Sequence, residues 1–227
     1  MEFQRFQPSV FEFLEQLADN NNRVWFLENK GRYESQVLQP AMAFIRAFQR
    51  KLKKISPHFV ASDRRVGGSL MRVYRDTRFS KGELYKTNVG IQFRHEQGRD
   101  IHAPGFYIHI APGECFLAAG LWRPEPEPLN QVRQAIVERH DRWRRVSKHK
   151  KFRERFSLEG HSLKRPPRGF PVAHPSVEDL KRTDFIGVEE LEERDAIDKR
   201  FIDRVAESFT ACRPFMRFLC DALKVPF

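Results

Sequence analysis

Residues 105–122 read GFYIHIAPGECFLAAGLW, and this stretch carries the clearest fold signal in the chain. Apolar and polar residues alternate on both sides of the central Pro-Gly-Glu, as in half-buried antiparallel strands joined by a tight turn. On the first strand the phenylalanine and the isoleucines share one face, so Tyr107 and His109 share the other. The stretch therefore predicts a hairpin with one apolar face for a core and a second face that carries polar side chains.

The same alternation extends over neighbouring segments, and helical periodicity lies on either side of them. Strands are predicted at residues 70–74, 88–94, 105–111, 115–122 and 185–188, with hairpin connections at 97–100 and 112–114. Helices are predicted at residues 9–17, 25–38, 40–55, 129–140, 148–156, 177–182 and 197–223, with Asn22 as a cap and Pro214 as an interruption. This order predicts an α+β fold, with a central antiparallel sheet flanked by N-terminal and C-terminal helices in a single domain over residues 1–227.

Composition excludes several classes of protein. With 227 residues, of which 40% are hydrophobic and 31% charged, the chain is expected to fold rather than to be disordered. No apolar run approaches the roughly 18 residues of a membrane span, and the three cysteines form no CxxC pair, so a reducing cytoplasmic location is expected. The histidines show no zinc-type spacing, and the glutamates at 189–193 are interpreted as a solvated surface. We expect no metal and no cofactor.

Positive charge is concentrated in the middle of the chain. The net charge is +11, from 41 Lys and Arg against 30 Asp and Glu. Residues 63–100 contribute +4 and residues 101–168 contribute +7, whereas residues 169–227 carry −3. Such an excess favours anionic partners, and its regional distribution indicates where they bind.

Residues 72–88 form the most suggestive basic segment, with three arginines and two lysines. Guanidinium and ammonium groups suit a phosphate or a carboxylate, and loops on a rigid sheet often carry binding groups. We therefore predict a pocket for an anionic small molecule on the polar face of the sheet, with the alternative that this loop is merely solvated. The predicted ligand-binding residues are Arg72, Tyr74, Arg75, Asp76, Arg78, Ser80, Lys81, Tyr85, Lys86, Asn88, Tyr107 and Trp122.

Catalysis at this pocket is a weaker hypothesis. His109 is the only nearby group that titrates near neutral pH, so it is the candidate acid or base. Ser80 lacks the context of an activated nucleophile. A lone histidine on a strand is more often structural than catalytic, so whether the chain is an enzyme stays open.

The chain resembles the bacterial and fungal DUF2461 family, whose function is unknown. The residues that carry the resemblance cover most of the chain, and they include Asn21-Asn22-Arg23, Trp25-Phe26, Arg75 to Lys81, Tyr85 to Asn88, Gly105 to His109, Gly120 to Pro124 and Pro167 to Phe170. One departure is Gly82-Glu83-Leu84, where similar sequences carry a second lysine and a proline. The resemblance supports the fold and brings no catalytic residues.

Two other functions remain open. Residues 139–155 hold nine Lys and Arg against two acidic residues, with Trp143 and Phe152 interleaved, which is compatible with binding of nucleic acid. The competing interpretation is a basic helix face whose aromatic residues, Phe156 included, anchor in the core. The last possibility is a protein-interaction module, for which no residue identifies the partner. The oligomeric state is not predicted.

Overall fold

A six-stranded antiparallel sheet lies at the centre of the structure, a computed structural model that describes residues 3–75, 83–98 and 103–227. Within these residues the strand order is β1-β2-β3-β4-β6-β5. The strands are β1 (Phe59–Val60), β2 (Val89–His95), β3 (Gly105–Ala111), β4 (Glu114–Leu121), β5 (Ser157–Glu159) and β6 (Phe185–Leu191). The predicted α+β class with a central antiparallel sheet is therefore confirmed.

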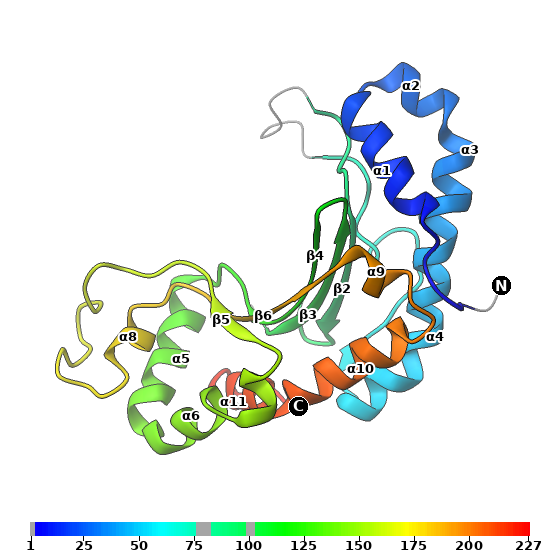
Figure 1. The fold of residues 1–227 in the computed structure, drawn as a ribbon. Helices are drawn as coiled ribbons and strands as arrows, with labels where there is room; N and C mark the ends of the chain where they lie inside the picture. The colour runs from blue at the N-terminus through cyan, green and yellow to red at the C-terminus, as the bar shows by residue number, and fades with distance from the viewer. Residues whose placement is uncertain (1–2, 76–82, 99–102) are drawn as a thin grey trace.

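Helices precede and follow the central strands (Figure 1). The N-terminal ones are α1 (Ser9–Asp19), α2 (Arg23–Glu28), α3 (Lys30–Arg32), the π-helical segment η1 (Tyr33–Leu38) and α4 (Gln39–Ile55). The later ones are α5 (Pro126–Glu138), α6 (His140–Ser147), α7 (Lys150–Arg153), α8 (Val177–Leu180), α9 (Glu193–Ala196), α10 (Phe201–Ala211) and α11 (Arg213–Ala222). No described helix has the length and apolar character needed to cross a membrane.

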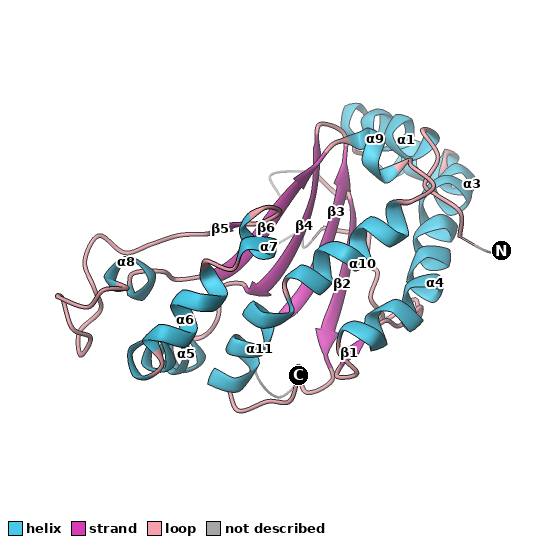
Figure 2. Ribbon diagram, turned by 60° about the horizontal axis from the view of Figure 1, so that its bottom comes forward, coloured by secondary structure: helices cyan, strands magenta, loops and turns pink. Residues whose placement is uncertain are grey.

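Helices α4, α10 and α11 cover one face of the sheet (Figure 2). Phe48 of α4 stacks on Phe93 of β2 with ring centroids 5.2 Å apart, and Phe209 of α10 packs on Phe106 of β3 at 4.6 Å. The apolar positions of β3 and β4 on this face are fully or almost fully buried. The alternation seen in the sequence thus assigns these residues to the core, as predicted.

The prediction of a regular strand at residues 70–74 is wrong. Leu70 and Tyr74 form only isolated bridges, to Ile91 and Tyr85. Since the segment bends between the two bridges, alternation does not fix its faces: Met71 is 38% exposed and faces away from the core. The sequence pattern also missed β1 and β5, which are too short to show a period.

Several helix boundaries differ from the prediction for local reasons. The segment 25–38 divides at Asn29, and its second half is π-helical. The cap at Asn22 is confirmed, because its Oδ1 accepts a hydrogen bond from the Trp25 amide at 3.0 Å. The C-terminal stretch divides at Cys212, and Pro214 lies in the first turn of α11, where a missing amide proton costs no hydrogen bond.

Glu189 corrects the view of the glutamate run as solvated surface. It lies on the helix-covered face of β6 and is only 5% exposed. One of its carboxylate oxygens lies 3.6 Å from Arg155 and 3.7 Å from Arg204. Burial raises the pKa of this carboxyl group, and the two guanidinium groups oppose the shift. The pair of arginines therefore ties the segment after α7 and helix α10 to the sheet.

Candidate functional site on the uncovered face of the sheet

No described helix covers the second face of the sheet (Figure 1). The side chains on this face surround a hollow. The hollow measures about 1070 Å³. Its walls come from the segments before β2, from the five strands β2 to β6, and from the described residues of the β2–β3 and β3–β4 connections. Residues that line it include Met71, Lys86, Asn88, Gln92, Tyr107, His109, Glu114, Phe116, Ala118, Trp122, Ile186, Val188 and Glu190. We call it the sheet hollow.

Small residues in the strands make room for the sheet hollow. Gly90 of β2 pairs with His109 of β3, and a Cβ at Gly90 would lie 2.9 Å from the Tyr107 hydroxyl and 3.0 Å from the Met71 sulfur. On β4, Ala118 pairs with Tyr107. Because neither neighbour has a bulky side chain, the Tyr107 ring can lie across the strands with its hydroxyl above Gly90.

Tyr107, His109 and Asn88 form a polar cluster on this face. The Tyr107 hydroxyl lies 3.0 Å from His109 Nδ1, and the Asn88 side-chain amide lies 3.5 Å from the same nitrogen. The His109 ring stacks on Phe116 with centroids 4.7 Å apart and planes 5° apart. The imidazole is thus fixed on one side by an aromatic ring and at Nδ1 by polar groups. Sequence analysis named three of these four residues and missed Phe116, which cross-strand pairing places beside His109.

Burial sets the protonation of the cluster. Burial lowers the pKa of His109. The carboxylate of Glu114, 3.8 Å from Nε2, opposes this shift. Burial also raises the pKa of Tyr107 to about 12. Near neutral pH, Tyr107 is therefore protonated and His109 is neutral. The Asn88 amide nitrogen, a donor, faces Nδ1, and the Glu114 carboxylate lies beside Nε2, so these contacts favour the neutral tautomer with its proton on Nε2.

Lys86 faces the same hollow from the segment before β2. Its pKa is lowered by burial and further by the charges of Arg72 and Arg75. Among the described residues, no carboxylate lies within 4.0 Å of its ammonium group. Lys86, Asn88, Tyr107 and His109 therefore line one hollow, and the positive charges of Arg72 and Arg75 act on Lys86.

Arg75 and Tyr85 make structural contacts. Arg75 donates from Nε to the Tyr85 carbonyl at 3.0 Å and pairs with Glu83 at 2.9 Å. Tyr85 is buried and stacks on Phe26 with centroids 4.0 Å apart. The side-chain oxygen of Asn21 accepts from the amides of Leu84 and Tyr85 at 3.0 and 2.9 Å, and its nitrogen donates to the Tyr85 carbonyl at 2.9 Å.

Sequence analysis missed this role of Asn21. Its three contacts link residues more than 60 positions apart, so no local pattern reveals them. The available signal was that Asn21 and Tyr85 both belong to the motifs that carry the family resemblance. Their contacts hold the segment that leads into Lys86.

The remaining predicted residues lie at the rim of the sheet hollow, away from it, or outside the described residues. Trp122 is 65% exposed at the rim of the sheet hollow, with the Arg123 guanidinium 4.9 Å from its ring centroid. Tyr74 and Arg72 are exposed and do not line the hollow. Asp76, Arg78, Ser80 and Lys81 lie outside the described residues.

A metal centre has no support in the described part of the chain. No group of three or more His, Cys, Asp or Glu side chains suited to a metal ion occurs within residues 3–75, 83–98 and 103–227. All three cysteines are buried, and burial raises the pKa of each thiol. The side chains that line the sheet hollow can themselves supply hydrogen bonds, charge and proton transfer.

Comparison with known proteins gives one match. The family described as "conserved hypothetical protein (DUF2461)" matches residues 9–218. No curated protein and no solved structure matches the chain.

Proposed function

The chain belongs to the DUF2461 family, whose description names no activity, and we propose from the geometry of the sheet hollow that it binds a small molecule with a phosphate or carboxylate group. One observation carries this proposal. Lys86 lines the same hollow as the hydrogen-bonded pair Tyr107 and His109, and the positive charges of Arg72 and Arg75 repel the charge of its ammonium group. An anion placed against Lys86 relieves that repulsion, so the site favours a negatively charged ligand.

The neighbouring groups define the rest of the ligand. Asn88 and Tyr107 supply a side-chain amide and a hydroxyl beside Lys86, and the His109 Nε2 proton is available as a donor. Phe116, Ile186 and Val188 add apolar surface on the same face. A few convergent polar groups within a largely apolar hollow are typical of sites for small organic ligands. The ligand class is therefore a small organic anion with polar substituents.

Acid–base catalysis on the bound ligand is the finer part of the proposal. The Tyr107 hydroxyl can pass its proton to His109 Nδ1 while it takes a proton from one ligand atom, so Tyr107 stays neutral and His109 becomes an imidazolium next to the Glu114 carboxylate; the reverse transfer returns the proton to the ligand. The turnover test compares wild type with His109→Gln: loss of turnover with retained binding supports an acid–base role. Equal turnover in both proteins removes it and leaves a binding site.

The binding test uses the whole chain and three classes of anion: inorganic phosphate, nucleoside monophosphates and dicarboxylates. A ligand present at about 100 times its Kd stabilises the folded state by about 2.7 kcal/mol, a clear thermal shift. We expect Lys86→Gln to lose this stabilisation and Lys199→Gln, an exposed lysine that lines neither hollow of the structure, to keep it. The proposal is wrong if no anion stabilises the protein or if both variants respond like wild type.

A further inference from the structure

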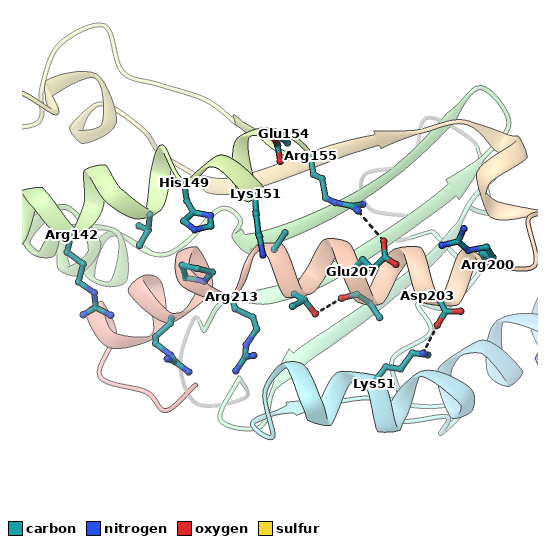
Figure 3. A pocket seen from close by; sticks show the side chains of 16 residues that line it. Lys51, Arg142, His149, Lys151, Glu154, Arg155, Arg200, Asp203, Glu207 and Arg213 are labelled. Carbon is teal, nitrogen blue, oxygen red and sulfur yellow. Dashed lines mark hydrogen bonds and ion pairs between the residues drawn. The ribbon is translucent and has the colours of Figure 1, made fainter.

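A second hollow lies on the helical side of the molecule, between α6 and α7 on one wall and α10, α11 and α4 on the other (Figure 3). It measures about 1150 Å³, and we call it the helical groove. Its charged lining residues are Lys51, Arg142, Lys151, Arg155, Arg200, Arg213 and Arg217 against Glu154, Asp203 and Glu207, with His149 alongside. The cations come from five separate parts of the chain, so the fold itself assembles this surface.

Positive charge remains after the acidic residues are matched with partners. Asp203 pairs with Lys51 at 2.6 Å, Glu207 with Arg155 at 3.1 Å, and Glu154 with a lysine outside the groove at 3.7 Å. Four cations of the groove have no carboxylate within 4.0 Å among the described residues: Lys151, Arg200, Arg213 and Arg217. The groove thus presents uncompensated positive charge to solvent.

The aromatic residues of segment 139–155 do not contribute to this surface. Trp143, Phe152 and Phe156 are at most 2% exposed. The interpretation that they anchor a basic helix face in the core is therefore confirmed, and stacking of bases on Trp143 and Phe152 is excluded. Only Arg142, His149, Lys151, Glu154 and Arg155 carry polar or charged groups of this segment into the groove, beside one apolar residue.

The cations are spread along the groove rather than gathered at one point. In Figure 3, Arg142 lies at one end and Arg200 and Lys51 lie at the other, with Lys151 and Arg213 between them. Helix α10 alone, with 11 residues, is about 16 Å long at about 1.5 Å per residue. A single phosphate needs cations that converge on one centre, whereas a row of cations matches a chain of phosphates.

We propose that the helical groove binds the backbone of a single-stranded nucleic acid through charge, with little dependence on base sequence. A duplex is read by an element that projects into its grooves, whereas a single strand fits within a basic hollow that follows its backbone. Because no Phe, Tyr or Trp is among the described residues that line the groove, phosphate contacts supply most of the affinity. Affinity therefore falls steeply with salt.

The experiment measures binding of labelled oligo-dT and oligo-U, about 16 nucleotides long, by fluorescence anisotropy across a salt series. The groove variant is Lys151→Glu with Arg213→Glu. The matched control is Arg144→Glu with Lys148→Glu, which makes the same change of charge at exposed residues of segment 139–155 that do not line the groove. Arg155 is left intact because it also contacts Ser208 and Glu189.

We expect the groove variant to lose at least about tenfold in affinity near 50 mM salt, and its log–log salt slope to become shallower by about 1.4, or about 0.7 for each lost contact. The control should lose less than about threefold. Circular dichroism shows whether the charge reversals disturb folding. If they do, Lys151→Gln with Arg213→Gln replaces the groove variant, and its affinity should again be lower than that of the control. Three results overturn the proposal: no wild-type binding at about 50 mM salt, equal losses in both variants, or tighter binding of a polyglutamate peptide, which assigns the groove to an acidic protein.

This test is independent of the sheet hollow. Lys151 and Arg213 line only the helical groove, and Lys86 and Tyr107 line only the sheet hollow. The groove variant should therefore keep the thermal shift that small anions produce. Lys86→Gln should keep its affinity for the oligonucleotides.

Discussion

Replacing Tyr107 by phenylalanine removes the hydroxyl group that lies 3.0 Å from His109 Nδ1. The hydroxyl donates to Nδ1 of the neutral imidazole, and after protonation it can turn and accept from the Nδ1 proton of the imidazolium. The bond to the charged ring is the stronger of the two, so loss of the hydroxyl weakens the charged form more than the neutral form. We expect the pKa of His109, which burial lowers in the wild type, to fall further in the variant.

The magnitude follows from the geometry of this contact. The Tyr107 and His109 side chains are half-buried, and a hydrogen bond contributes about 0.5–1.5 kcal/mol between neutral groups and about 1.5–3 kcal/mol to a charged group. The difference of about 1–1.5 kcal/mol, at about 1.4 kcal/mol for each pKa unit, predicts that the pKa of His109 falls by about 0.7–1.1 units. The Asn88 amide, at 3.5 Å, is too distant to replace the hydroxyl fully.

The assay is a titration of the histidine ring signals by NMR in wild type and Tyr107→Phe. The ring signals of His149, which lies in the helical groove, serve as the internal control and should keep the same chemical shifts in both proteins at a fixed pH. An unchanged or higher pKa for His109 in the variant would refute a hydrogen bond between the Tyr107 hydroxyl and the imidazolium. A simultaneous shift of His149 would show that the substitution disturbs the fold as a whole.

Three further predictions concern stability. Asn21→Ala should lower the free energy of unfolding in urea by about 2–3 kcal/mol, because three hydrogen bonds to the segment before β2 are lost. The control Asn20→Ala loses one exposed hydrogen bond and should cost less than about 1 kcal/mol. Equal costs would contradict this role of Asn21. Below about pH 6.5 His109 binds a proton more readily in the unfolded chain than in the folded protein, because its pKa is lowered on folding. The free energy of unfolding should therefore fall by at most about 1.4 kcal/mol for each unit of decreasing pH, and His109→Gln should remove this pH dependence. A variant with the same pH profile of stability as wild type would argue against a lowered pKa. Phe152 is buried in the core, so Phe152→Ala should cost about 3–5 kcal/mol of stability, and the folded fraction should keep its affinity for oligonucleotides. Normal stability together with weak affinity would contradict this and would mean that Phe152 faces a ligand.

The parts of the fold that follow from local residue patterns could be predicted from the sequence. The alternation in residues 105–122 places Tyr107 and His109 opposite the core because the side chains of a paired strand point to alternate faces. Residues 70–74 show the same alternation and form only two isolated bridges. Alternation therefore predicts the faces of a strand only where neighbouring strands pair along its whole length.

Contacts between distant segments could not be predicted. Asn21 holds Tyr85 across 64 positions, and Arg213 and Arg200 join the helical groove from a region whose net charge is negative. Glu189 has the same residue type as its exposed neighbour Glu190, and only the packing of α10 on β6 explains why it is buried between arginines. These features depend on tertiary packing, which no periodicity encodes.

The central claim, that the sheet hollow binds a small anion at Lys86, is tested most directly by backbone amide NMR during titration with the anion that gives the largest thermal shift. The account predicts saturable changes at Lys86, Asn88, Tyr107 and His109, and an upward shift of the pKa of Lys86 as the anion offsets its repulsion by the neighbouring arginines. Changes confined to the helical groove, or none at Lys86 at saturation, would contradict it.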